Sequence, residues 1–311
     1  MYKPKKGGGL YVRKSSKSEG KKIVVLYHAE CSDGFGGAFA AWKKFGKKAE
    51  YFPLYHDRPP LDLKDRKIIF VDFTYPENTM KKLIKNNNVD VIDHHVTSRR
   101  AASLAQTHVY SDKRSGSVLA WRHFFPDRPT PKLFRYIEDF DLWKFKLPHT
   151  KEISAYIDAV DYDFKIWGRL VGNFENVKKL SEYIRKGGII LDYESKTVRN
   201  LIETKSVSVR FEGLKTLAVN SPLYNSQLGD ALRKKCPPIG IVWFENGAHK
   251  KISLRSNGKV DVSKLAQKYG GGGHKTSAGF ALPLDAALPW KRLSSSSYEA
   301  TKKYENTKKS L

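Results

Sequence analysis

Short apolar runs alternate with helix-like stretches over the first 125 residues. Residues 23–27, Ile-Val-Val-Leu-Tyr, form a β-branched run that ends in a polar, glycine-containing turn, and residues 36–45, rich in Ala and aromatic side chains, have helical character. The alternation continues with strands over 67–72 and 89–92 and helices over 77–86 and 116–125. Strands separated by helices of this length are typical of a parallel sheet with helical crossovers. The pattern therefore predicts an α/β fold.

From residue 133 onward, longer helical stretches replace the alternation of strands and helices. Residues 133–145, 152–170 and 175–205 are largely helical in pattern, and Gly187-Gly188 is expected to break the last stretch. Beyond residue 205 a smaller α/β unit is predicted, with strands over 206–211, 216–220, 239–244 and 250–255 and helices over 226–234 and 262–269. We therefore expect an N-terminal parallel-sheet domain over 23–187, a linker helix over 188–204 and a smaller α/β domain over 205–290, with the active site in the cleft between the two domains.

The net charge of +25 on 311 residues indicates a polyanionic partner. Residues 1–22 carry +7 and residues 291–311 carry +4, which leaves +14 on the middle of the chain. Both ends are rich in Lys and Ser and poor in branched apolar residues, so we expect disordered basic tails. Such tails either improve solubility or tether nucleic acid, and composition does not separate the two.

Cysteine usage and hydropathy limit the class of protein. The two cysteines, Cys31 and Cys236, cannot build a disulfide framework and lack the spacing of a zinc motif. No charge-free apolar run is long enough for a membrane span, and the N-terminal segment lacks the apolar core of a secretory signal. The expectation is a cytoplasmic protein without a membrane partner.

Candidate metal ligands follow the predicted strands. His28 and Asp33 come after the first strand, Asp72 ends the second, and the triplet Asp93–His95 follows the third. Ligands of open α/β sheets bind outside the carboxyl ends of the strands, so these groups should converge in one crevice. Carboxylates and imidazoles suit a pair of hard divalent ions, which can clamp a phosphoryl group undergoing in-line displacement. The residues thus favour a metal-dependent hydrolase.

The order of these motifs resembles a known family. HxxCxDG at 28–34, VDF at 71–73, DHH at 93–95, EDxDLW at 138–143 and GGGH at 271–274 occur in the order found in the DHH–DHHA1 phosphoesterase superfamily. The match runs from about residue 23 to 283 and looks closest to the short branch of oligoribonuclease-like enzymes. The resemblance implies an N-terminal DHH domain, a C-terminal DHHA1 domain and two Mn²⁺ ions, with Mg²⁺ as the other candidate.

The resemblance also implies a role for each matching residue. Asp93 would orient a neighbouring ligand, and His95 would contact the scissile phosphate and protonate the leaving oxygen. Asp141 would be a supporting residue, although its spacing also fits a surface or cap role. The implied metal ligands are His28 and Asp33 from the first motif, Asp72 as the bridging carboxylate, and His94 with Asp139 at the second ion.

One position departs from the family pattern. The first motif of the family has two aspartates, and here the earlier one is replaced by Cys31 or displaced to Glu30. A thiolate is a soft ligand that matches Mn²⁺ and Mg²⁺ poorly. The alternative is that Cys31 is a small buried residue beneath the site.

The second unit carries a glycine run followed by His274. Residues 270–275 fail the P-loop pattern, because His274 stands where that pattern needs a glycine before the lysine. Glycines still allow backbone N–H groups to approach an anion closely. By resemblance, Gly271, Gly272, Gly273 and His274 would bind the terminal nucleotide.

Two further substrate contacts are predicted outside that loop. Arg255 is a candidate for a phosphate or base contact, or else an ordinary cation on a strand face. Arg114 and Ser115 precede a predicted helix and either present donors to a phosphate or simply cap the helix.

These observations leave three functional hypotheses. The first is a metal-dependent phosphodiesterase that hydrolyses short oligonucleotides or single-stranded ends to nucleoside monophosphates, acting as a monomer or homodimer. The second is a small-molecule phosphoesterase acting on cyclic or linear dinucleotides, nucleoside bisphosphates or polyphosphate. The third is a nucleic-acid-binding protein with a degenerate site, for which Cys31 is the only support in the sequence.

Overall fold

The structure, a computed structural model, describes residues 22–55, 59–247 and 249–293. The predicted tails therefore lie almost entirely outside the described residues. The part of the second tail that is described departs from the prediction, because residues 291 and 292 belong to a strand that pairs with residues 209 and 210. Among the helices of the described residues, none has the length and apolarity needed to cross a lipid bilayer.

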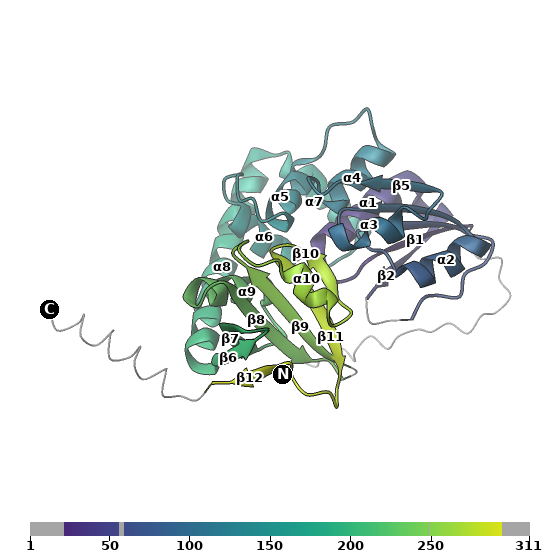
Figure 1. Cartoon of the computed structure of the whole chain (residues 1–311). Coiled ribbons are helices and arrows are strands. Elements are labelled where there is room, and N and C mark those ends of the chain that lie inside the picture. The colour runs from purple at the N-terminus through teal and green to yellow at the C-terminus, as the bar shows by residue number, and fades with distance from the viewer. Residues whose placement is uncertain (1–21, 56–58, 248, 294–311) are drawn as a thin grey trace, which may run out of the picture.

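The N-terminal unit is built on a five-stranded sheet in which every strand is parallel to its neighbours (Figure 1). The strand order is β2-β1-β3-β4-β5, so β1, β3 and β4 lie at its centre. This confirms the predicted parallel α/β sheet. The strands are β1 (Ile23–His28), β2 (Ala49–Leu54), β3 (Lys67–Val71), β4 (Asn88–Asp93) and β5 (Thr107–Tyr110).

Helices bury both faces of this sheet, which explains why its central strands β1 and β3 are apolar without alternation, whereas β4 contains Asp90, which pairs with Lys67. Val25 and Ile69 pack on the side of α1 and α4, whereas Val24 and Ile68 pack on the side of α2 and α3. The helices on these faces are α1 (Ser32–Phe45), α2 (Glu77–Asn86), α3 (Arg99–Ala102) and α4 (Gly116–Phe124), and two short 3₁₀ turns, η1 (Gly46–Lys48) and η2 (Val96–Ser98), complete the unit.

A helical layer joins the two units. It consists of α5 (Lys132–Asp141), α6 (Thr150–Asp158), α7 (Phe164–Phe174) and the long α8 (Val177–Lys205). The predicted break at Gly187-Gly188 is wrong, because α8 runs through both glycines. Gly187 instead permits close packing, since a Cβ atom there would lie only 1.8 Å from the carbonyl oxygen of Glu152 in α6. The expected linker is therefore the second half of one continuous helix.

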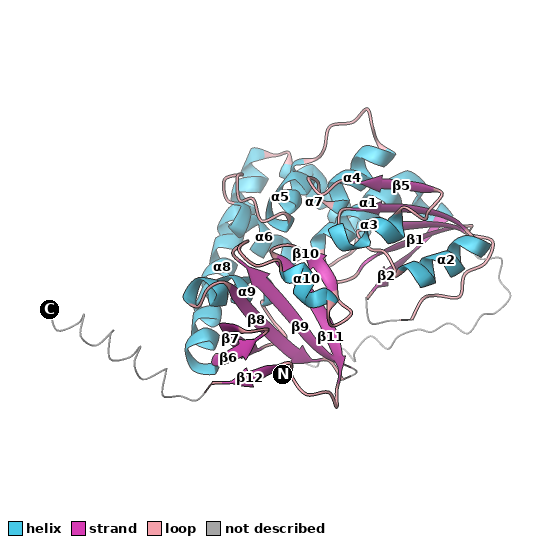
Figure 2. Ribbon diagram, in the orientation of Figure 1, coloured by secondary structure: helices cyan, strands magenta, loops and turns pink. Residues whose placement is uncertain are grey.

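The C-terminal unit is a seven-stranded mixed sheet with the order β10-β11-β9-β8-β7-β6-β12 (Figure 2). Only β7 and β8 are parallel neighbours. Helix α10 (Val262–Gln267) packs on one face, while α9 (Asn225–Lys235) and the end of α8 pack on the other. The strands are β6 (Val207–Phe211), β7 (Leu214–Asn220), β8 (Ile239–Glu245), β9 (His249–Ser256), β10 (Gly272–His274), β11 (Ser277–Pro283) and β12 (Trp290–Arg292).

Five strands had no predicted counterpart: β2, β5, β10, β11 and β12. Four of them are edge strands, two in each sheet. An edge strand pairs on one side only and stays partly exposed, so its sequence does not have to be apolar on both faces. Pro53 in β2 is an example, because proline within sheets is found mainly on edge strands.

Candidate active site

The polar residues predicted at the strand ends meet at the carboxyl edge of the first sheet. His28 ends β1, Asp72 directly follows β3, and Asp93 ends β4. Asp72 has a positive φ of 56°, a left-handed conformation that is costly for a residue with a side chain. Such strain is typical of functional sites, where surrounding contacts maintain it. The parallel register thus brings together three motifs that are far apart in the sequence.

His94 lies at the centre of this cluster and is 1% exposed. Its Nε2 atom is 3.0 Å from Asp72 Oδ1, 3.6 Å from Asp141 Oδ2 and 3.8 Å from Asp33 Oδ2. Burial lowers the pKa of His94, but the carboxylates of Asp72, Asp141 and Asp33 outweigh it and raise the pKa to about 10. In the absence of metal, an imidazolium therefore balances the crowded carboxylates.

Asp33 is oriented by the start of α4. Its Oδ2 accepts a hydrogen bond from the N–H of Gly116 (2.6 Å), and its Oδ1 accepts from the N–H and Oγ of Ser117 (3.0 and 2.6 Å). Helix N-termini favour negative charge, so the first turn of α4 binds a carboxylate of the protein itself.

This arrangement changes the reading of Arg114 and Ser115. Ser115 is fully buried, its side chain caps α4, and its N–H donates to Glu138 Oε2 (3.1 Å), so the structure does not leave it available as a substrate contact. Arg114 remains partly exposed and pairs with Glu138 Oε1 (2.9 Å). The capping alternative therefore describes Ser115.

The fourth motif contributes a different residue from the one predicted. Asp139 accepts hydrogen bonds from the N–H groups of Lys146 (2.9 Å) and Leu147 (3.0 Å) and from the hydroxyl of Thr150 (2.6 Å). Its oxygens thus hold the loop after α5, and Asp139 is not among the possible ligands grouped around Asp72 in the described residues, so metal binding by Asp139 stays a prediction. Asp141, two residues later and at the end of α5, turns toward His94 instead. Burial and the neighbouring Asp33 raise the pKa of Asp141 to about 7.

The first motif places Cys31 in the cluster and Glu30 outside it. His28 Nδ1 lies 3.4 Å and Cys31 Sγ lies 3.9 Å from Asp72 Oδ2. Glu30 is exposed and accepts a hydrogen bond from the hydroxyl of Tyr55 (2.9 Å). Burial and the adjacent Asp72 raise the pKa of the Cys31 thiol well above its usual range, so the metal-free thiol is protonated. Of the two alternatives for the missing aspartate, the structure favours Cys31.

His95 is held by Asp93. Its Nδ1 is 2.7 Å from Asp93 Oδ1, and Asp93 Oδ2 accepts a hydrogen bond from the hydroxyl of Thr74 (2.8 Å). Asp93 is fully buried and also accepts the N–H of His94 (2.7 Å). Burial lowers the pKa of His95, but the Asp93 carboxylate outweighs it and raises the pKa above its ordinary value. The predicted orienting position of Asp93 is thus matched by its contacts.

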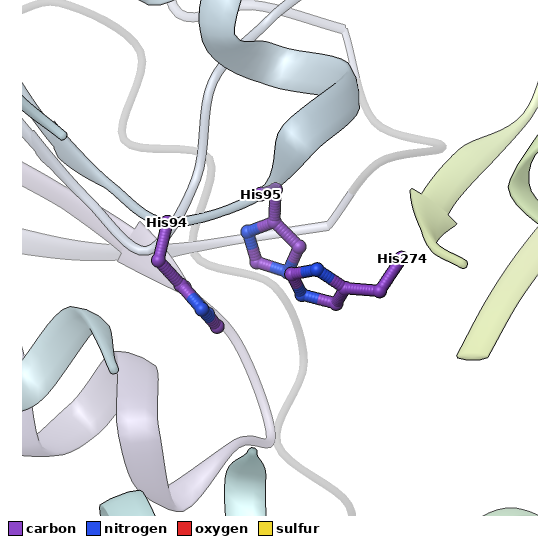
Figure 3. Close-up of side chains that lie close together, drawn as sticks. All are labelled: His94, His95 and His274. Atoms are coloured by element: carbon purple, nitrogen blue, oxygen red, sulfur yellow. The ribbon is translucent and has the colours of Figure 1, made fainter. Parts of the chain in front are cut away.

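The glycine run of the second unit reaches across to this cluster. Figure 3 shows His274 directed from the C-terminal unit toward His95, and the two rings stack with centroids 4.9 Å apart. Gly273 donates its N–H to Thr97 Oγ1 in η2 (3.1 Å), and a Cβ atom on Gly272 would lie 2.8 Å from the same oxygen. Burial and the adjacent His95 and His94 lower the pKa of His274 to about 3, so its ring is neutral. The glycines therefore allow the second unit to approach the metal-ligand cluster closely.

Arg255 has partners within its own unit. Its Nη2 donates to Ser226 Oγ (2.8 Å) and its Nη1 to the carbonyl of Leu254 (3.0 Å). Burial lowers its pKa to about 10. No contact with the cluster is present among the described residues, so substrate binding by Arg255 stays a prediction.

The donor atoms in the cluster fit divalent cations. Asp72 Oδ1, His94 Nε2 and Asp141 Oδ2 are buried and have no hydrogen-bond partner among the described residues. Unsatisfied buried polar atoms are rare and call for a partner. Candidate ligand atoms lie within 4.8 Å of one another in four overlapping groups. Three of them share Asp72, namely Asp33–Asp72–His94, His28–Cys31–Asp72 and Asp72–Asp93–His95, and the fourth is His94–His95–His274. A pair of ions bridged by Asp72 would satisfy the buried atoms of Asp72, His94 and Asp141.

Comparison with known proteins indicates the DHH–DHHA1 superfamily. Residues 225–290 match the DHHA1 domain family. An uncharacterised protein of Acanthamoeba polyphaga mimivirus is 31% identical over 300 residues, which cover 87% of this chain and 70% of that protein. Oligoribonuclease NrnB of Bacillus subtilis is 23% identical over 297 residues, which cover 83% of this chain and 72% of that protein. The crystal structure of RecJ from Thermus thermophilus in complex with Mn²⁺ has a TM-score of 0.47 and 16% identity, over 85% of this chain and 50% of that chain.

Proposed function

Because the chain belongs to the DHH–DHHA1 superfamily of phosphoesterases, we propose that it is a metal-dependent phosphodiesterase that releases nucleoside monophosphates from short oligonucleotides or single-stranded ends. The observation that carries this proposal is the buried group of Asp33, Asp72, His94 and Asp141, whose unsatisfied atoms face one another. The similarity to an oligoribonuclease supports a nucleotide substrate.

The proposed ligands divide between two ions. Asp33, His94 and Asp141 would hold one, His28 and Cys31 would hold the other, and Asp72 would bridge them, while the carboxylates suit Mn²⁺ or Mg²⁺. Bound there, the ions supply Lewis-acid activation of the phosphoryl group and of the attacking water.

His95 is the proposed general acid. The Asp93 carboxylate raises the pKa of His95, which favours the protonated ring, and the contact of Nδ1 with Asp93 leaves Nε2 available to a substrate. When the bond between phosphorus and the leaving oxygen breaks, the proton on Nε2 would pass to that oxygen. General acid catalysis of this kind contributes about 10²–10⁴-fold. Asp93 and Thr74 would act as positioning residues, because they fix the orientation of the ring.

His274 is the proposed substrate contact from the second unit. Its neutral ring lies against His95 and can donate one hydrogen bond to a phosphate without adding charge. The N–H groups of Gly271 and Gly273 already donate to the carbonyl of Ala266 (2.9 Å) and to Thr97 Oγ1 (3.1 Å), and Gly272 pairs with Gly279 between β10 and β11, so the proposed contact from this run is the His274 side chain.

A basic pocket beside α4 and α5 would attract the rest of the strand. It has a volume of about 220 Å³ and is lined by Arg114, Arg122, Arg135, Lys144 and Lys146, together with Glu138 and Asp139. Both acids are engaged by other groups, and within the described ranges neither Arg122 nor Arg135 makes an ion pair. The excess positive charge would neutralise phosphates of a bound polyanion.

Hydrolysis of a substrate panel tests the proposal. The panel contains a linear dinucleotide, a cyclic dinucleotide, single-stranded RNA and DNA, and polyphosphate, each with Mn²⁺ or Mg²⁺. We expect release of nucleoside monophosphates from the linear nucleotides, loss of at least about a hundredfold in rate in Asp72→Asn and His95→Gln, and unchanged turnover in the exposed control Glu30→Gln. Turnover of the cyclic dinucleotide or polyphosphate alone would replace the nuclease with a small-molecule phosphoesterase. Strand binding without any turnover would indicate a binding protein.

A further inference from the structure

We infer that the ion site next to β1 is a mixed nitrogen–sulfur–oxygen site in which the thiolate of Cys31 is a ligand, and that this site selects Zn²⁺ over Mg²⁺. The inference rests on the proposed function only in placing metal ions in this cluster. The inference concerns only the ion bound at this first site. The second site is richer in carboxylates and is not expected to select Zn²⁺.

The local backbone decides which side chain of the first motif enters the cluster. Glu30 has a left-handed φ of 51°, whereas Cys31 is extended at the N-cap of α1, with φ −133° and ψ 130°. The change of conformation between neighbouring residues sends their side chains apart. Glu30 extends outward to Tyr55, and Cys31 Sγ joins His28 and Asp72. A thiol therefore occupies the place of a carboxylate ligand.

The separations between donor atoms are closer to those around a tetrahedral ion than to those around an octahedral one. Zn²⁺ binds sulfur at about 2.3 Å and nitrogen or oxygen at about 2.0–2.2 Å, which at tetrahedral angles places N and O about 3.4 Å apart and S and O about 3.6 Å apart. The observed distances to Asp72 Oδ2 are 3.4 Å from His28 Nδ1 and 3.9 Å from Cys31 Sγ. Octahedral angles would require only about 2.9 and 3.1 Å for the same bond lengths.

Asp72 divides the cluster into two chemically different halves. Its Oδ2 faces His28 and Cys31, and its Oδ1 faces His94. The first half offers imidazole, thiolate and one carboxylate oxygen, a donor set that zinc accepts and that magnesium, which requires oxygen ligands and water, does not. The second half, with Asp33 and Asp141 around His94, offers two further carboxylates and suits a harder ion. The cluster is thus built for two unlike ions.

Binding of a divalent ion by Cys31 requires no further reactant. The S–H bond of Cys31 is replaced by a metal–sulfur bond, and the proton leaves to the buffer; no oxidation state changes. A bound divalent ion deprotonates a coordinating thiol outright, so the protonated state of the metal-free thiol does not oppose this step.

Cobalt substitution tests the inference without relying on turnover. The reduced full-length protein is stripped of metal and titrated with Co²⁺, while bound cobalt is counted by equilibrium dialysis and absorption spectra are recorded. We expect a sulfur-to-cobalt charge-transfer band in the near ultraviolet for the wild type and for Cys236→Ser, the matched control, because Cys236 is outside the cluster. Cys31→Ser and Cys31→Asp should bind cobalt without this band. Zn²⁺ should abolish the band, and excess Mg²⁺ should leave it.

The Zn²⁺ affinity provides a second readout. Loss of the sulfur ligand in Cys31→Ser should raise the Kd by more than about tenfold, since loss of even a supporting group outside the ligand set costs about 10–100-fold. Cobalt bound by the wild type without the band, or a band that persists in Cys31→Asp, would overturn the inference, as would failure to bind cobalt at all. Turnover with no band would leave the phosphodiesterase standing, whereas a band with no turnover on any substrate would leave the metal site standing and remove the function.

Discussion

Exchanging the two aspartates of the fourth motif for asparagine separates metal binding from loop support. Sequence reasoning assigned the metal to Asp139, and the structure instead turns Asp141 toward His94. Asp139→Asn and Asp141→Asn are chemically identical changes two residues apart on the same helix. We expect opposite consequences, because the two carboxylates have different partners.

Asp139→Asn should lower the free energy of unfolding. The Asp139 carboxylate is 5% exposed and accepts three hydrogen bonds from the loop at 146–150. An amide keeps one oxygen, so one of these bonds is lost and the others become neutral. Charged hydrogen bonds contribute about 1.5–3 kcal/mol and neutral ones about 0.5–1.5 kcal/mol, so replacing three charged bonds by two neutral ones gives a loss of about 4–6 kcal/mol.

The loss should depend on pH in a defined direction. Burial raises the pKa of Asp139, but the hydrogen bonds from Thr150, Leu147 and Lys146 outweigh it and lower the pKa below 3.8. The stabilisation is therefore present above the ordinary pKa and disappears as pH falls through the lowered one. At neutral pH the whole difference between Asp139 and asparagine should be observed.

Asp141→Asn should weaken metal binding and leave the metal-free fold as stable or more stable. Burial and Asp33 raise the pKa of Asp141 to about 7, which means that its ionised form is unfavourable in the folded protein. Removing that charge relieves repulsion above this pH. The second ion, however, loses a carboxylate ligand, and we expect its Kd to rise by at least about tenfold.

Two measurements distinguish the roles of Asp139 and Asp141. Urea unfolding in EDTA, followed by circular dichroism, gives the stability of both variants, and Mn²⁺ titration followed by the electron paramagnetic resonance of the free ion gives the affinity. The reasoning is refuted if Asp139→Asn loses Mn²⁺ while keeping its stability, or if Asp141→Asn binds Mn²⁺ as the wild type does. Loss of both properties in one variant would show that the loop and the ion site are coupled.

Three further perturbations test other parts of the molecule. Gly188→Ala should stabilise the protein by about 1 kcal/mol, because nothing lies within 4 Å of the new Cβ atom. Gly187→Ala should destabilise it by about 1–3 kcal/mol, because the Cβ atom would meet the Glu152 carbonyl; equal effects in urea unfolding would contradict the close packing of α6 on α8. In EDTA, the raised pKa of His94 stabilises the fold fully below 6.5, and that stability is lost as pH rises through about 10. The Tm of the wild type should therefore fall over this range more than that of His94→Gln, and parallel profiles would count against the pairing. Arg122→Gln/Arg135→Gln should weaken binding of single-stranded DNA in EDTA, measured by fluorescence anisotropy, and lower the salt slope by about 1.4. Arg169→Gln/Arg185→Gln, which removes the same charge outside the pocket, should change the slope less; equal changes would remove the basic pocket from substrate capture.

Much of the first sheet could be predicted from the sequence because its central strands are buried on both faces. A doubly covered parallel strand is mostly apolar, so β1 and β3 were recognisable as apolar runs, and β4 by the three apolar residues Val89, Val91 and Ile92 around Asp90. The same reasoning fails at the sheet edges, where β2, β5, β10 and β12 pair on one side only. It also fails at Gly187, since glycine breaks a helix or allows close packing according to what lies opposite, and Glu152 is 35 residues away in sequence.

The position of the candidate metal site could also be predicted, because parallel strands end at one edge whatever their order in the sheet. As expected, the predicted ligands lie close together, namely His28, Asp33, Asp72 and His94. The family resemblance had indicated each of them as a metal ligand. The sequence by itself thus determined the fold class, the edge of the sheet that carries the site and most of the donor types.

Only the tertiary structure decided which of two nearby candidates faces the cluster. The sequence does not distinguish Asp139 from Asp141 as the residue that faces the cluster. It also does not show whether Glu30 or Cys31 takes the place of the missing aspartate. The choice depends on the direction of each Cα–Cβ bond, which changes by about 100° per residue in a helix and abruptly where φ becomes positive, as at Glu30. The partners that hold the unused groups, Tyr55 for Glu30 and the loop at 146–150 for Asp139, come from other segments of the chain. Side-chain direction is set by packing between distant segments, and composition and spacing carry no information about it.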